Sequence, residues 1–287
     1  MTRRLINFEF RSSFRLLLVI WAALIAMTIL MCILLRVTGL SSYDQFIYSQ
    51  NALGLIDGIV HVISWILYVA LFAALVVLTV AIVIARFYRG LLGDEGYLMH
   101  TLPVKTWQLI TAKGITASCA VLGSVLVGIL SIVLIANVGK GFSIFEVLGD
   151  IGRGIAEEPL LLVIGIEMLI LVVLGVLKSV YQIYAAISIG QMSNRHRVLA
   201  SLGSYIGITV VLSILVGIFV FVMNITGAGE ALGTWMEGSS IIVSDGEISG
   251  FGRGQVYLIL CFLAEAIQLA AFHMVSERLL TKRLNLL

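Results

Sequence analysis

Residues 86–114 have the sequence RFYRGLLGDEGYLMHTLPVKTWQLITAKG and form a polar stretch between two long apolar runs. The stretch holds four basic and two acidic residues, yet several leucines and a tryptophan remain within it. Asp94 can begin a short helix by accepting a backbone N–H, and Pro103 suits the first turn of a following helix. We therefore expect a short interfacial helix near residues 94–100, a break, and a second helix that leads back into the membrane.

The runs on either side of this stretch define the class of protein. Hydrophobic residues make up 60% of the chain and charged residues 12%, against about 25% charged in an ordinary soluble domain. The mean hydropathy is +1.11, which excludes the soluble classes. The runs are continuously apolar for about twenty residues, whereas a β-barrel would show shorter segments of alternating polarity. The sequence therefore predicts an all-α, polytopic membrane protein.

Six membrane spans follow from these runs. They are expected at residues 16–35, 59–85, 115–138, 160–190, 198–223 and 256–275. Each is long enough for a helix to cross a hydrocarbon core of about 30 Å, and the fourth must tilt, kink or project beyond it. The longest connection, residues 224–255, is too short for a soluble domain, so residues 1–287 are predicted to form a single transmembrane domain. Gly203 and Gly207 in the fifth span have the spacing of a helix-packing motif, although glycine is common in membrane helices.

The basic residues predict the orientation. The N-terminal segment and residues 86–114 carry four each, the turn at residues 195–197 two, and the C-terminal tail three, which places thirteen on one side. The opposite side carries only four, namely Arg36, Lys140, Arg153 and Arg253. Basic residues concentrate in cytoplasmic loops, so both termini and residues 86–114 are predicted to be cytoplasmic.

The segment GDEGYLMHTLPVKTWQLITAK, after the second span, resembles the corresponding loop of permease subunits of the ABC-2 class of bacterial ABC transporters. The resemblance implies a coupling helix that docks into a separate ATPase subunit, which would bind the ATP and Mg²⁺. It also implies a second permease subunit, identical or paired, and a place in the bacterial cytoplasmic membrane. The residues expected at the partner contact are Asp94, Glu95, Tyr97, Leu98, Leu102 and Pro103. An ordinary solvated loop is the alternative interpretation.

Ionisable residues within the spans are the other candidates for function. Glu265 lies at the middle of the sixth span, with Gln268 about one turn later. Glu167 lies in the fourth span, and Lys178 follows eleven residues later on nearly the same helical face. Charge at that depth is costly, so Glu167, Glu265 and Gln268 could line a translocation path. The structural alternative for Glu167 and Glu265 is a hydrogen bond between helices. The structural alternative for Lys178 is a side chain that extends to the cytoplasmic headgroups.

The sequence lacks the motifs of several other functions. It has no G-x-x-x-x-G-K-[ST] motif, so ATP hydrolysis is not expected on this chain. Its three cysteines lie in apolar runs and its four histidines lack ligand spacing, so no metal or other cofactor is predicted on this chain. No nucleic-acid partner is predicted. The leading hypothesis is the transmembrane subunit of an ATP-driven exporter. The alternatives are an ion- or proton-coupled carrier that uses Glu167 and Glu265, and a membrane scaffold or sensor.

Overall fold

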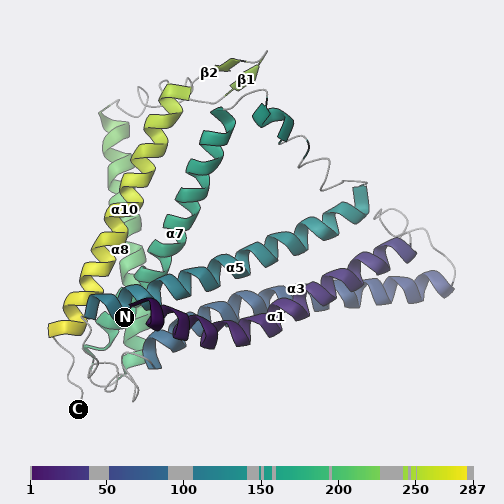
Figure 1. Ribbon diagram of the computed structural model, residues 1–287, viewed down its shortest axis with the longest axis horizontal. Helices are drawn as coiled ribbons and strands as arrows, with labels where there is room; N and C mark the ends of the chain where they lie inside the picture. Colours follow the sequence, from purple (N-terminus) through teal and green to yellow (C-terminus); the bar gives the residue numbers. More distant parts are fainter. Residues whose placement is uncertain are drawn as a thin grey trace. The chain divides into compact units, whose positions relative to one another are not determined.

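The computed structural model describes residues 2–38, 52–89, 106–140, 149, 152–156, 160–193, 196–226, 242–244, 247–249 and 251–282. Its long helices are α1 (Thr2–Thr38), α3 (Ala52–Phe87), α5 (Thr106–Lys140), α7 (Leu160–Gly190), α8 (Arg197–Ile225) and α10 (Phe251–Lys282) (Figure 1). Each of these six helices contains a segment long and apolar enough to cross a membrane. The prediction of a helical fold with six candidate spans is confirmed.

The helices agree with the predicted spans in number but not always in length. Helix α7 has the predicted bounds, whereas the other five helices begin earlier and end later than the predicted spans. Helix α1 begins at Thr2, so the basic N-terminal segment belongs to the same helix as the first span. The predicted bounds follow the apolar runs, but i to i−4 backbone hydrogen bonds continue through polar residues beyond such a run.

A small antiparallel ribbon departs from the purely helical prediction. Strands β1 (Ile242–Ser244) and β2 (Glu247–Ser249) pair with Val243 opposite Ile248. The ribbon lies within the long connection between the fifth and sixth spans, where the two strands are joined by only two residues. The predicted short helix at residues 94–100 lies outside the described residues.

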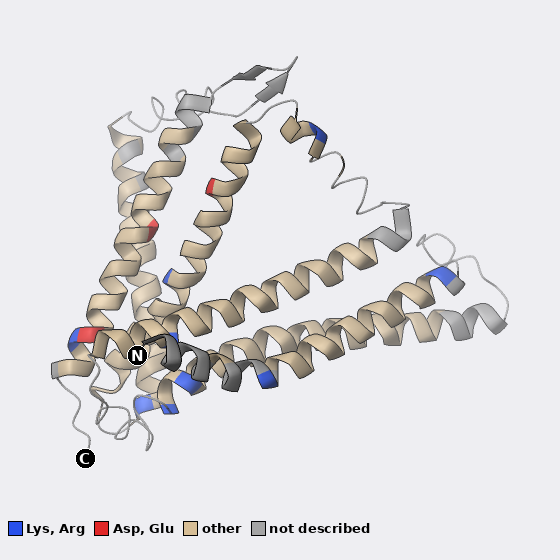
Figure 2. Cartoon of the chain, in the orientation of Figure 1, with Lys and Arg blue, Asp and Glu red and all other residues tan. Residues whose placement is uncertain are grey.

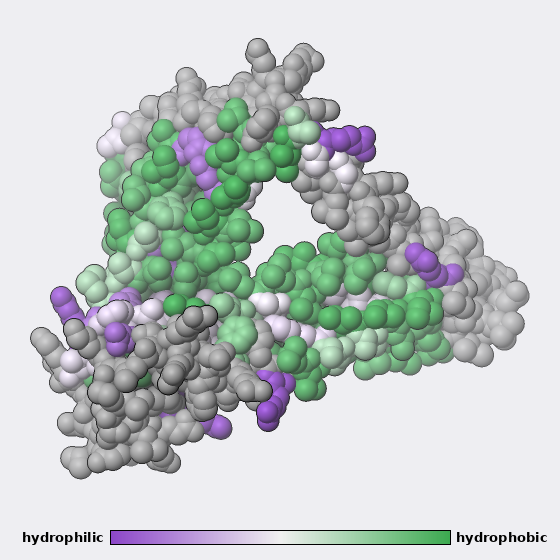
Figure 3. Space-filling model, viewed as in Figure 1, coloured by the Kyte–Doolittle hydropathy of each residue, from purple (hydrophilic) through white to green (hydrophobic). Residues whose placement is uncertain are grey.

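The chain divides into two compact units. The first unit comprises Met1–Ala85 and Thr116–Gly152, and the second comprises Arg86–Ile115 and Arg153–Leu287. A single transmembrane domain over residues 1–287 stays a prediction. Along the described helices, charged residues are few (Figure 2), and the part of the visible surface that these helices form is largely hydrophobic (Figure 3). A surface of this kind is suited to contact with lipid chains.

The first unit is held together by an apolar core at regular helical spacing. Leu24 and Met31 of α1 are buried, and so are Tyr68 and Leu75 of α3. In each pair the residues are seven apart, which places them two turns apart on one face of their helix. Trp21 and Phe72 are among the partly buried side chains packed around this core.

Hydroxyl groups add interhelical hydrogen bonds in the same unit. Ser124 of α5 accepts bonds from Trp21 Nε1 of α1 at 3.1 Å and from Thr79 Oγ1 of α3 at 2.9 Å. Farther along α5, Ser131 Oγ lies 2.9 Å from the Tyr68 hydroxyl of α3. These neutral bonds join all three helices without placing a charge in the apolar region.

Gly123 leaves the space that Trp21 needs in this unit. A Cβ at Gly123 would lie 2.5 Å from the far edge of the Trp21 ring, which the hydrogen bond to Ser124 holds in place. We expect Gly123→Ala to lower the free energy of unfolding by about 1–3 kcal/mol through overpacking. Gly217→Ala is the matched control, because nothing lies within 4 Å of a Cβ there. Unfolding in mixed micelles should show a loss for the first variant only, and equal stability of the two would contradict the packing.

Candidate functional site between helices α7 and α10

Helices α7, α8 and α10 lie side by side in the second unit, with α7 in contact with both of the others (Figure 1). The contacts between α7 and α10 join Glu167 with Gln255, Lys178 with Glu265, and Tyr181 with His273. The partner numbers rise together, so the two helices are parallel. Helix α8 lies between α7 and α10 in the sequence. Consecutive membrane spans run in opposite directions, so the fourth and sixth spans are expected to be parallel.

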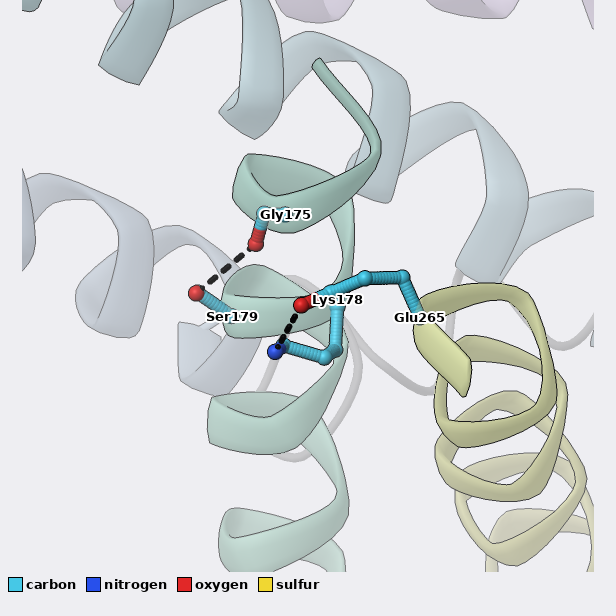
Figure 4. Close-up of polar contacts among 4 residues, drawn as sticks. All are labelled: Gly175, Lys178, Ser179 and Glu265. Atoms are coloured by element: carbon cyan, nitrogen blue, oxygen red, sulfur yellow. Dashed lines mark hydrogen bonds and ion pairs between the residues drawn. The ribbon is translucent and has the colours of Figure 1, made fainter. Parts of the chain in front are cut away.

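An ion pair joins the middle parts of α7 and α10. Lys178 Nζ lies 2.7 Å from Glu265 Oε1, and the two side chains are only 22% and 26% exposed (Figure 4). The second carboxylate oxygen, Oε2, is buried and has no hydrogen-bond partner among the described residues. It lies beside Gly175, where an added Cβ would be 4.0 Å away. The pair removes the net charge of the two groups in an apolar setting but leaves one carboxylate oxygen unsatisfied.

A second polar contact lies nearer the N-terminal ends of the same helices. Gln255 Nε2 donates a hydrogen bond of 2.7 Å to Glu167 Oε2. The partner of Glu167 is therefore the Gln255 amide of α10, and not Lys178 of its own helix, which pairs with Glu265. Gln268, which was predicted beside Glu265, is half-buried on α10. The structure thus brings the two candidate carboxylates to one helix interface, where both have partners.

Farther along α7, an aromatic cluster is formed by Phe87, Tyr181, Tyr184 and His273. The rings of Phe87 and Tyr184 are stacked, with centroids 3.9 Å apart and planes at 17°. Tyr181 meets Tyr184 and His273 edge to face, with centroids 5.9 Å and 5.3 Å away. Phe87 and Tyr184 are almost fully buried, at 0% and 1% exposed. The cluster thus connects the last residue of α3 with α7 and α10.

The start of α5 packs on the same tyrosines. The Tyr184 hydroxyl donates a hydrogen bond of 3.2 Å to the main-chain oxygen of Lys113. At Gly114, an added Cβ would lie 2.5 Å from the Tyr181 hydroxyl, so a larger residue there would have to displace the Tyr181 side chain. The two tyrosines therefore contact residues on both sides of the segment 90–105.

Helix α8 contacts α7 by a different set of residues. Gln182 Nε2 donates to Thr209 Oγ1 at 3.1 Å, and a Cβ at Gly190 would overlap Ser201. Gly203 and Gly207 are exposed, with nothing within 4 Å of an added Cβ. Among the described residues, the predicted glycine motif therefore makes no helix contact.

The six residues predicted at the partner contact belong to the segment 90–105. Asp94, Glu95, Tyr97, Leu98, Leu102 and Pro103 all lie outside the described residues. Within the described part of the chain, no group of three or more His, Cys, Asp or Glu side chains could hold a metal ion. No family model, curated protein or solved structure matches this chain.

Proposed function

We propose that this chain is the transmembrane subunit of an ATP-driven exporter of the ABC-2 type, in the bacterial cytoplasmic membrane. Because the chain has no P-loop motif, ATP and Mg²⁺ would bind a separate ATPase subunit. A second permease subunit, identical or paired, would complete the transporter. The residues at 93–103 would form the contact with the ATPase.

One observation supports this proposal above the others. Phe87 and Lys113, on either side of the segment 90–105, both contact Tyr184 of α7. Packed side chains and hydrogen bonds can carry a change at a cytoplasmic loop to a distant membrane helix. The contacts of Tyr184 supply such a connection, whereas a merely solvated loop would need none.

The contacts of the intramembrane carboxylates bear on the second candidate, a proton-coupled carrier. Glu167 and Glu265 are the groups that such a carrier would use. Each accepts a hydrogen bond of 2.7 Å from a side chain of the neighbouring helix. These bonds favour a structural role in joining α7 to α10, so the carrier remains the weaker hypothesis.

Purification in mild detergent tests the proposed function. A tagged full-length chain should co-purify with a P-loop ATPase, and the complex should hydrolyse ATP in a vanadate-sensitive manner. A carrier would instead purify without an ATPase and show transport that depends on a proton gradient in vesicles lacking ATP. The second result would overturn the proposal.

The orientation gives a separate prediction. The excess of basic residues on one side predicts cytoplasmic N- and C-termini. In a background without Cys32, Cys119 and Cys261, a cysteine at Thr281 should be protected from an impermeant thiol reagent in intact cells, and one at Ser239 should react. Thr281 suits this test because it is exposed, whereas the nearby Ser276 is fully buried. Labelling at 281 with protection at 239 would reverse the topology.

A further inference from the structure

We propose that Tyr181 and Tyr184 act as a rigid joint, which fixes the helix ends flanking residues 90–105 to the α7–α10 pair. The consequence for transport rests on the proposed function, but the joint itself is a property of this chain. Tyr181 and Tyr184 would be positioning residues, since they act through the helix ends that they hold.

The geometry favours a joint rather than an accidental contact. The Tyr184 ring stacks on the Phe87 ring of α3, and the Tyr184 hydroxyl donates a hydrogen bond to the main-chain oxygen of Lys113 in α5. Stacked rings and a hydroxyl donor constrain both the direction and the distance of the two helix ends. One side chain therefore holds the end of α3 and the start of α5 at once.

Tyr181 extends the joint to α10. It packs closely over Gly114 of α5 and meets the His273 ring edge to face at 5.3 Å. One turn earlier on α7, Lys178 pairs with Glu265 of α10 at 2.7 Å. The joint thus adjoins the ion pair along the same helix interface, so a displacement of the helix ends would reach both α7 and α10.

The surrounding residues are consistent with a rigid body. The C-terminal half of α7 is closely packed, with buried residues Val180, Tyr181, Tyr184, Ala185, Ala186, Ile187, Ser188 and Gly190. Leu109, Ile110 and Ala112 at the start of α5 are also buried. Close-packed interiors transmit displacement because they deform little.

Hydrogen exchange of the purified full-length chain tests the joint directly. In Tyr184→Leu, which removes the stack and the hydroxyl, the amides of residues 86–89 and 106–114 should exchange roughly tenfold faster. Tyr184→Phe keeps the ring and removes only the donor. Its effect should be smaller and confined to residues 106–114, and this milder variant decides the question if Tyr184→Leu does not fold.

Thr209→Val is the matched control. It removes a different hydrogen bond of α7, the one that Gln182 of α7 donates to Thr209 of α8. It should leave exchange at residues 86–89 and 106–114 unchanged. Unchanged exchange at both segments in the Tyr184 variants, or an equal change in the control, would overturn the joint.

The complex with the ATPase tests what the joint does. ATP with orthovanadate should alter exchange around residues 265–273 in the unmodified complex. The Tyr184→Leu complex should retain the ATPase but lose that response. A full response in the variant would refute the role in coupling. If no ATPase co-purifies with the unmodified chain, the proposed function fails, while exchange in the isolated chain still decides whether the joint exists.

Discussion

Lys178→Met should lower the free energy of unfolding by about 3 kcal/mol, because it leaves the Glu265 carboxylate unpaired in an apolar interface. The two groups are 2.7 Å apart and mostly buried, so water can replace the lost partner only poorly. Unfolding of the purified protein in mixed micelles, followed by circular dichroism, measures the loss.

The double variant Lys178→Met/Glu265→Gln distinguishes the cost of an unpaired Glu265 charge from the cost of losing the Lys178 side chain itself. It removes both charges and should recover most of the stability of the unmodified protein. Ser179→Ala is the matched control, since among the described residues the Ser179 hydroxyl bonds only to the Gly175 carbonyl of its own helix (Figure 4). A double variant as unstable as Lys178→Met would contradict the pairing.

Tyr97→Ala/Leu98→Ala should insert normally but abolish either association with the ATPase or the ATP hydrolysis that depends on this chain. Anchor residues of an interface cost about 2 kcal/mol or more each on truncation, so the pair should weaken the complex by roughly several hundredfold. The measurements are co-purification and the ATPase activity of the complex relative to the ATPase alone. Ser239→Ala/Ser240→Ala, in the opposite connection, is the control and should change neither. Full complex formation and full activity in the Tyr97/Leu98 variant would contradict the proposed contact and would indicate that residues 93–103 are an ordinary solvated loop.

The spans could be predicted from the sequence because hydropathy is a local property. Helix α7 has the predicted bounds, since Pro159 precedes it and a polar turn at residues 191–193 follows it. The start of α1 could not be predicted, because four arginines suggested a surface segment while the backbone continues as one helix from Thr2. Charge lowers the hydropathy of such a segment without breaking its hydrogen bonds.

The candidate site could be predicted only in part. The depth of Glu167 and Glu265 in their spans marked both as unusual, and both lie at the α7–α10 interface. Their partners were missed, because Lys178 and Glu265 are 87 residues apart and their meeting depends on the register of two parallel helices. The stack of Phe87 on Tyr184 is also long-range, and aromatic residues in apolar runs give no sign of which neighbour they contact.

The most direct test of coupling through residues 93–103 is photocrosslinking in native membranes. A photoreactive amino acid would replace Tyr97, and the same substitution at Ser239 would serve as the control. The proposed function predicts an adduct between position 97 and a P-loop ATPase, with no such adduct from position 239. Crosslinks from position 97 to lipid alone, while an ATPase is still recovered with the chain, would contradict it.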